Sequence, residues 1–414
     1  MTKLKKIMKT IFTLFLSIYF LNSGLLAKEW VEMESSRPAE PVWEVNTVSR
    51  GHLEISFELG GYFIDELENG RKLISFPGGV SMLQEGTPDL PRMAQSIIIP
   101  DLAHMELSIL EADFVETTIS DIASSKGNIT RDIDLASVPY AYGKEYETDA
   151  FFPEQVVFLR DPYILRTIRG QAVVFQPIQY NPIQRILRIY TNIKIGVQEN
   201  GTSTVNPLLQ RPMAGGSREF ENMYREHFIN YTTEDRYVPV SEPGPMRIIS
   251  YGGFMEAMQP FVDWKNYKGI PTEMVDVADI GTIDDIDAYI ESEYYEDGIA
   301  FVLLVGDIAQ IESIRRSEGD GSNTPSDNSF TFIAGNDFYP DLIIGRFSAE
   351  NTTHVETMVN RTISYEMDPD PTDDWYKKGS GFASNQGPGD DGEYDDEHMD
   401  NIRELLLDYT YVHV

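Results

Sequence analysis

The sequence predicts a multidomain protein in which an all-β N-terminal part, most simply a sandwich, precedes an α/β part built on a parallel sheet. Two patterns support this fold class. Apolar residues recur at every second position between about residues 50 and 200, whereas after residue 245 short apolar runs alternate with helical segments. The stretch between them, 201–245, is rich in charge, Pro and Gly and contains one short helical segment at 217–228, which is typical of a domain boundary.

Composition narrows the classes of function. The chain has 414 residues, a formal net charge of -34 and no cysteine. A surface this acidic repels phosphate, which argues against binding to nucleic acid or to an anionic membrane. Without cysteine, these residues contain no disulfide, no thiolate metal site and no thiolate nucleophile.

Residues 1–27 have the pattern of a secretory signal peptide. Four lysines fall among the first nine residues, the apolar run Ile11–Leu21 follows, and small residues lead to Ala27. We therefore expect a protein that is exported, either secreted or held at the cell surface. No second long apolar stretch follows, so no membrane span is predicted after signal removal. Residues 28–50 are polar and contain Pro, and we expect a flexible entry there.

The β part is predicted for residues 51–200. Leu53, Ile55, Phe57 and Leu59 alternate with polar residues, which places one face of a strand on a core and the other in water. The same alternation returns near residues 105–109 and 187–197. The histidines of this half are far apart and lack nearby catalytic partners, so structural roles are expected for them.

The α/β part is predicted for residues 246–414. Strands are expected at 246–251, 272–277, 300–305, 341–345 and 381–384, with helices at 253–269, 284–298, 351–366 and 396–409. In such sheets, ligands bind at the carboxyl ends of the strands. The last four residues resemble the beginning of another strand, so we expect a sheet that is incomplete at the C-terminus of this chain.

Acidic residues gather at two places in the α/β part. Asp307 follows one apolar run, while Asp337 and Asp341 precede the next. If the two strands are neighbours, the three carboxylates can converge at one sheet edge, where hard oxygen ligands suit Ca²⁺. The second patch spans 390–400. In both places the alternative is equally open: the acids cap loops or a helix and face water.

Common catalytic signatures are absent. The sequence contains no G-x-S-x-G, Walker loop, H-E-x-x-H or EF-hand spacing.

Several ordered blocks nevertheless resemble one family. They are EGTPDLP (85–91), RYVPV (236–240), FVDWKNYKGIPTE (261–273), FVLLVGD (301–307), SDNSF (326–330), GNDFYPDLIIGRFS (335–348) and RTISYE (361–366). These blocks are similar to those of the gingipain-type cysteine peptidases, secreted caspase-like endopeptidases made as proenzymes. The resemblance is loose in the N-terminal half and specific in the second half.

The resemblance implies site residues. Arg236-Tyr237 matches the junction where the prodomain is cut off, and Asp395 matches the aspartate that holds a substrate arginine. Gln386 stands where the family has a glutamate that orients the catalytic histidine. Calcium sites are implied at two groups: Asp307, Asp337, Tyr339 through its carbonyl and Asp341, and then Glu393, His398 and Asp400.

The implied activity is cleavage of proteins or peptides after a basic residue, with the enzyme's own prodomain as intramolecular inhibitor. The family's catalytic histidine and cysteine fall beyond the position that matches Val414, so we expect the chain as given to be inactive. Two alternatives stay open: a catalytically dead, calcium-stabilised binding module, and a caspase-like surface-processing sortase or transpeptidase. A Gly-His-Gly followed about thirty residues later by Ala-Cys would favour the peptidase.

Overall fold

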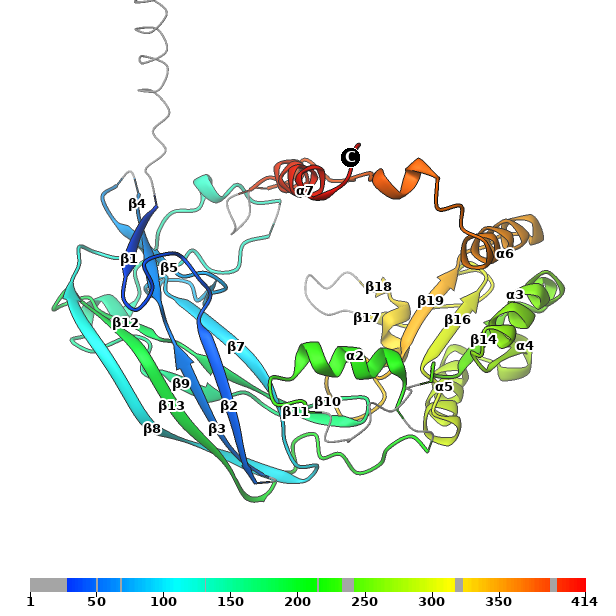
Figure 1. Cartoon of the computed structure of the whole chain (residues 1–414), viewed down its shortest axis with the longest axis horizontal. Helices are drawn as coiled ribbons and strands as arrows, with labels where there is room; N and C mark the ends of the chain where they lie inside the picture. Colours follow the sequence, from blue (N-terminus) through cyan, green and yellow to red (C-terminus); the bar gives the residue numbers. More distant parts are fainter. Residues whose placement is uncertain are drawn as a thin grey trace, which may run out of the picture.

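A computed structural model describes residues 28–49, 51–67, 69–130, 132–213, 216–232, 242–316, 323–387 and 393–414. The predicted signal peptide and the predicted processing residues Arg236 and Tyr237 lie outside the described residues. Among the helices that are described, none is long and apolar enough to cross a bilayer. Figure 1 shows a β-rich part on one side of the molecule and an α/β part on the other.

The N-terminal part consists of three antiparallel sheets. Their strand orders are β12-β13-β3-β2 with β8 paired to β13, β10-β11-β7-β6 with β9 paired to β11, and β1-β4-β5. The strands are β1 (Glu29–Glu32), β2 (Val42–Ser49), β3 (His52–Glu58), β4 (Gly61–Glu66), β5 (Lys72–Ser75), β6 (Val80–Ser81), β7 (Pro91–Ile98), β8 (Ala103–Thr118), β9 (Val157–Leu159), β10 (Tyr163–Leu165), β11 (Ile168–Phe175), β12 (Ile178–Asn181) and β13 (Ile186–Thr202). Short 3₁₀ helices are η1 (Leu135–Ser137) and η2 (Lys144–Glu147).

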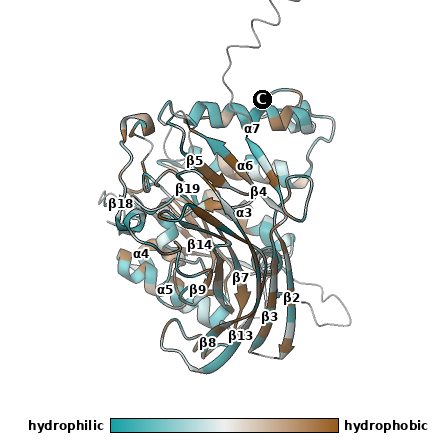
Figure 2. Cartoon of the chain, turned by 90° about the vertical axis from the view of Figure 1, so that its left-hand side faces the viewer, coloured by the Kyte–Doolittle hydropathy of each residue, from teal (hydrophilic) through white to brown (hydrophobic). Residues whose placement is uncertain are grey.

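The two larger sheets pack face to face, as the sequence predicts. On β3, Leu53, Ile55 and Phe57 are 4 %, 0 % and 0 % exposed, while the residues between them face outward. Phe57 stacks on Phe175 of β11, with ring centroids 5.0 Å apart, so side chains from both sheets form one core. Apolar stretches run along β3, β7 and β13 in Figure 2.

The expectation of a flexible entry at residues 28–50 is wrong. Residues 29–32 and 42–49 form β1 and β2, which pair with β4 and β3. The physical reason is aromatic packing: Trp30 lies against Phe63 at 4.9 Å, and Trp43 packs on Phe57 and Phe175. The alternation Trp43, Val45, Thr47 is the strand signal that the polar neighbours obscured.

The α/β part is a four-stranded parallel sheet in the order β15-β14-β16-β19. Its strands are β14 (Met246–Ser250), β15 (Thr272–Asp276), β16 (Phe301–Val305) and β19 (Ile343–Phe347), and its helices are η3 (Gly252–Phe254), α3 (Met255–Tyr267), α4 (Val277–Ile280), α5 (Ile283–Asp297) and α6 (Thr352–Met367). Helices α3 and α6 bury apolar residues against one sheet face and α5 against the other. The predicted βα alternation and the coverage of both faces are confirmed.

Helices α3 and α6 are joined by one carboxylate. Glu366 on α6 accepts hydrogen bonds from Trp264 Nε1, Lys265 Nζ and Lys268 Nζ on or just after α3, at 2.8, 2.7 and 2.8 Å. Burial alone would raise the pKa of Glu366, but these bonds outweigh burial and lower the pKa to about 2.

Glu366→Gln should lower the free energy of unfolding by about 2 kcal/mol at pH 7, after allowance for solvent screening of the partly exposed group. Because the folded-state pKa is depressed, the contribution is present above the unfolded-state value and is lost as pH falls toward about 2. Urea unfolding at pH 7 and pH 2.5 measures this. Glu356→Gln, at an exposed position of the same helix, is the control and should change little at either pH.

The chain after α6 differs from the prediction. Residues 381–384, expected as a strand, pair with no strand in the described part of the chain, and Phe382 is 88 % exposed. A single parallel bridge forms instead between Lys378 and His413. It is flanked by η5 (Asp374–Lys377) and α7 (Asp395–Tyr409), and α7 buries none of its residues. A strand forms only where it has a hydrogen-bonded partner. Among the described residues the parallel sheet ends at the edge strand β19, and no further strand pairs with it.

Helix α2 (Arg218–His227) lies between the two parts (Figure 1). Its Phe220 and Tyr224, and Phe228 just after it, are buried in one cluster with Tyr163 and Leu165 of β10 and Ala300 of the α/β part. The helix predicted within the 201–245 connector is confirmed. Its apolar face fills the junction, so this portion of the connector is part of a core.

Candidate functional site

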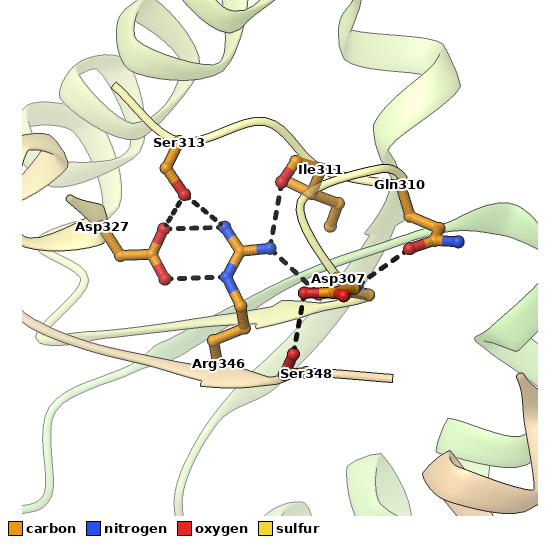
Figure 3. Close-up of polar contacts among 8 residues, drawn as sticks. Asp307, Gln310, Ile311, Ser313, Asp327, Arg346 and Ser348 are labelled. Atoms are coloured by element: carbon orange, nitrogen blue, oxygen red, sulfur yellow. Dashed lines mark hydrogen bonds and ion pairs between the residues drawn. The ribbon is translucent and has the colours of Figure 1, made fainter. Parts of the chain in front are cut away.

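The carboxyl edge of the parallel sheet carries the first candidate residue. The register pairs Val305 of β16 with Phe347 of β19, which brings the next residues of both strands together. Ser348 Oγ donates to Asp307 Oδ1 at 2.9 Å (Figure 3). A hydrogen bond from the Ile308 amide, together with the one from Ser348, holds the pKa of Asp307 below its usual value. Asp307 is therefore an oriented, ionised carboxylate at the edge where such sheets bind ligands.

The turn after β16 requires glycine. Gly306 has φ +142°, and a Cβ added there would lie 2.8 Å from Cβ of Gln310. The close approach lets Gln310 Oε1 accept the Asp307 amide at 3.0 Å. The Gly-Asp pair ending the FVLLVGD block is thus a tight turn that presents Asp307.

Arg346 of β19 forms hydrogen bonds to residues between β16 and β19, above the carboxyl ends of these strands, as Figure 3 shows. Its guanidinium pairs with Asp327 through Nε and Nη2, both at 2.7 Å, and also donates to Ser313 Oγ and to the carbonyls of Gly306 and Ile311. Burial alone would raise the pKa of Asp327, but the bonds from Arg346 and Ser313 outweigh it, so the pKa is lowered. This network joins both strand ends to the 3₁₀ turn η4 (Asp327–Thr331), which follows β18 (Thr324–Pro325), and to Ser313, which precedes β17 (Arg315–Arg316).

Sequence reasoning missed this network. Arg346 and Asp327 lie within the GNDFYPDLIIGRFS and SDNSF blocks, whose resemblance to the family assigns no role to either residue. A signal was present: an arginine inside an otherwise apolar strand requires a partner, because a buried guanidinium is almost always paired.

The predicted residues Gln386 and Asp395 are brought together. The Asp395 amide donates to the Gln386 carbonyl at 2.9 Å, and the Gln386 amide donates to Ser384 Oγ at 3.0 Å. Ser384 Oγ in turn donates to the Asp395 carboxylate. Gln386 is exposed and Asp395 partly exposed, so the two residues form an open acidic turn at the first turn of α7.

The second predicted calcium group is only partly assembled. His398 Nδ1 lies 2.9 Å from Glu393 Oε2, whereas Asp400, two positions after His398 on α7, points from a different helix face. Within the described ranges, no group of three or more His, Asp or Glu side chains is arranged to hold a metal ion.

The first predicted calcium group is not one site. Asp307 follows β16, whereas Asp337 and Asp341 precede β19, and the strands are parallel with Phe301 paired to Ile343. Residues that precede one strand therefore lie at the opposite end of the strands from residues that follow the neighbouring strand. The strands alone separate the two edges by roughly 13 Å. The predicted convergence of the three carboxylates is wrong because it ignored this direction.

Asp337 and Asp341 instead hold the β part. Asp341 is fully buried, and its carboxylate accepts the amides of Arg166, Ile333 and Ala334 at 2.7, 2.9 and 2.6 Å. Burial raises the pKa of Asp341 to about 7. Asp337 accepts the amide of Ile164 of β10 at 2.8 Å.

The predicted ligand Tyr339 lies at the same joint. Asp337 also accepts the Tyr339 amide at 2.9 Å, and the Tyr339 ring stacks on Tyr163 of β10 with centroids 3.8 Å apart. Because Asp337, Tyr339 and Asp341 lie at this joint and Asp307 lies at the other end of the strands, these four residues do not form one calcium centre. Calcium binding stays a prediction, which a calcium titration of the melting temperature tests.

Comparison with known proteins agrees with the two-part architecture. Residues 55–238 match the family model Propeptide_C25, and residues 240–413 match the model of peptidase family C25.

Three relatives come from Porphyromonas gingivalis. Gingipain R1 is 35 % identical over 376 residues, covering 87 % of this chain and 37 % of the relative. Gingipain R2 of strain W83 is 36 % identical over 355 residues, covering 82 % and 46 %. Lys-gingipain HG66 is 25 % identical over 321 residues, covering 74 % and 18 %. The chain thus spans less than half the length of each of these relatives.

A solved complex of the RgpB pro- and mature domains from the same species shares 32 % identity, covers 46 % of this chain and 98 % of the other, and has a TM-score of 0.41. The family assignment rests on the sequence matches. The chain belongs to the gingipain-type family of cysteine peptidases, peptidase family C25, and carries that family's propeptide region followed by residues of its peptidase domain.

Proposed function

We propose that this chain belongs to the precursor of a secreted endopeptidase that cleaves after a basic residue and is activated by a cut at Arg236-Tyr237. The observation that carries this proposal is the junction between the two family matches. The propeptide match ends at residue 238, two residues past the proposed cut, and the peptidase match begins at residue 240. The cut would separate the β part and α2 from the parallel sheet.

The chemistry implied by the family is attack of a thiolate on the peptide carbonyl, with a histidine that protonates the leaving amine. The 414 residues contain no cysteine, so this nucleophile is not among them. What the chain contributes is positioning. The Arg346 network shapes the loop at the carboxyl edge, and the Gln386 amide group can accept a hydrogen bond from an imidazole, although it stabilises an imidazolium less than a carboxylate does.

Substrate choice is assigned to Asp395. A carboxylate can bind the guanidinium of a substrate arginine through two parallel hydrogen bonds, a geometry that lysine cannot reproduce. In the described residues the Asp395 carboxylate accepts from Ser384 and the Asp395 backbone amide donates to the Gln386 carbonyl, which supports a role beside the proposed histidine-orienting residue.

Asp395→Asn should reduce kcat/KM for arginine substrates about 100-fold in a precursor extended to include the family's histidine and cysteine, because a charge-assisted pair is worth roughly 3 kcal/mol. Fluorogenic Arg and Lys peptides measure this, with Asp408→Asn at an exposed position of the same helix as control. The chain of 414 residues serves as the blank and should show no turnover. Equal loss on both peptides would contradict an arginine-selective role.

Arg236→Ala should abolish maturation at the proposed junction, because the enzyme's own specificity would make the cut. N-terminal sequencing of the mature product measures this, and a product beginning at Tyr237 is expected from the unchanged chain. The control is Arg225→Ala, an exposed arginine on α2, which should mature normally. Unchanged processing of Arg236→Ala would remove the junction from the proposal.

The alternatives differ in whether the family's cysteine is kept. A binding module would lack the Cys, whereas a sortase or transpeptidase would keep it and pass the acyl group to an amine instead of water. Product analysis with an added amine nucleophile separates that activity from hydrolysis. Calcium, if it binds, would act as a stabilising ion and would raise the melting temperature.

A further inference from the structure

One arginine of the β part ends inside the α/β part. Arg166 occupies the two-residue turn between β10 and β11, and it is 1 % exposed. Its Nη1 donates to the carbonyls of Ile299 and Asp341 at 2.9 and 2.8 Å, and its Nη2 donates to the carbonyl of Gly298 at 2.8 Å. All three acceptors belong to the α/β part.

The arginine socket comprises these three carbonyls, the Asp341 carboxylate and Tyr294. The carboxylate accepts the Arg166 amide at 2.7 Å, and the Tyr294 hydroxyl donates to the Arg166 carbonyl at 3.0 Å. The Tyr294 ring lies 5.3 Å from the guanidinium carbon, and the ring of Phe220 of α2 lies 4.7 Å from it.

The socket is electrostatically suited to a cation. Gly298 is the C-terminal cap of α5, a helix of 15 residues. The carbonyls of Gly298 and Ile299 therefore lie at the negative end of the helix dipole. Carbonyl oxygens converging on one buried point lose hydration, and a guanidinium supplies several donors in a planar fork that satisfies them together.

The backbone indicates that the side chain is needed. Arg166 has φ +53°, a left-handed conformation that glycine adopts at no steric cost. Two-residue hairpin turns favour glycine at such positions for this reason. Retaining arginine at such a position costs backbone energy, which the contacts made by the guanidinium must offset.

We propose that the α/β part carries a guanidinium-binding socket, and that Arg166 in this socket is the anchor that keeps the β part bound after the connecting chain is cut. The partner is therefore the protein's own severed propeptide. That the cut occurs in nature rests on the proposed function. The binding itself does not, because every contact is already present in the uncut chain.

The test uses the full chain with residues 233–241 replaced by the recognition site of a sequence-specific protease, so it does not depend on processing at Arg236. After cleavage, the two fragments of the otherwise unchanged chain should elute together from a sizing column. Arg166→Gly keeps the turn but removes the guanidinium, and its fragments should separate, with a Kd about 100-fold higher or more by ultracentrifugation over a dilution series. Tyr294→Phe removes only one hydroxyl and should raise the Kd about fivefold.

The matched control is Arg169, which lies on β11 three residues after Arg166. Arg169 is also fully buried, but its guanidinium donates only to carbonyls on the propeptide side of the cut, at Pro100 and Ala103 in the β part and at Val205 and Asn206 in the connector. Arg169→Ala should lower the melting temperature while its fragments stay associated. The proposal is overturned if Arg166→Gly and Tyr294→Phe both keep the original Kd, or if Arg169→Ala separates the fragments as readily as Arg166→Gly.

Discussion

Replacing Arg346 by alanine should lower the free energy of unfolding of the α/β part by about 4 kcal/mol, because it strands a half-buried carboxylate. The Arg346 side chain is 13 % exposed and that of Asp327 is 24 % exposed, so water can compensate only in part. The substitution also leaves the carbonyls of Gly306 and Ile311 without their arginine donor. Denaturant unfolding followed by tryptophan fluorescence measures the change.

Two further variants make the Arg346 result specific. Arg346→Lys keeps the charge but loses the paired contact with Asp327, and it should recover less than half of the lost stability. Arg361→Ala, at an exposed position of α6, should fall within about 0.5 kcal/mol of the unchanged chain. If Arg346→Ala were as mild as Arg361→Ala, the network would be a surface feature and the loop would be held by other contacts.

Replacing Asp341 by alanine should cost about 4 kcal/mol, because three buried amides would each lose their acceptor. The amides belong to Arg166, Ile333 and Ala334, so the damage reaches both parts of the molecule. Asp341→Asn keeps one carbonyl oxygen and should be milder. The unfolding free energy in urea is the measurement.

The control for Asp341 is Asp263→Ala, since Asp263 lies at an exposed position of α3 and accepts one side-chain hydrogen bond there. It should change stability by less than about 0.5 kcal/mol. An Asp341→Ala variant as stable as Asp263→Ala would show that water or a rearranged loop replaces the lost acceptor.

Local patterns predicted most of the fold. The alternation at Leu53, Ile55 and Phe57 reports which strand face is buried, and the same rule works within any strand. Helix α5 shows the same for helices: Thr282 and Asp285 form a capping box at its start, and Gly298 ends it in the left-handed conformation. These signals act over a few residues, so one sequence suffices to read them.

The site was harder to predict because its contacts join distant residues. Asp341 follows its partner Arg166 by 175 positions, and Arg346 reaches Asp327 across 19. The acidic residues can be recognised in the sequence as a class, but their grouping depends on strand direction and register. Asp307 and Asp341 flank neighbouring strands and still lie at opposite sheet edges, which no spacing along the chain reports.

The three hydrogen bonds that the Asp341 carboxylate accepts from backbone amides affect how the protein unfolds on heating. The Asp341 carboxylate accepts a backbone amide of a β hairpin in one part and two backbone amides of a loop in the other. If either part unfolded first, backbone amides in the other would lose their hydrogen-bond acceptor. Calorimetry of the intact chain should therefore record one cooperative endotherm spanning both parts, and uncoupling through Asp341 should split it into two.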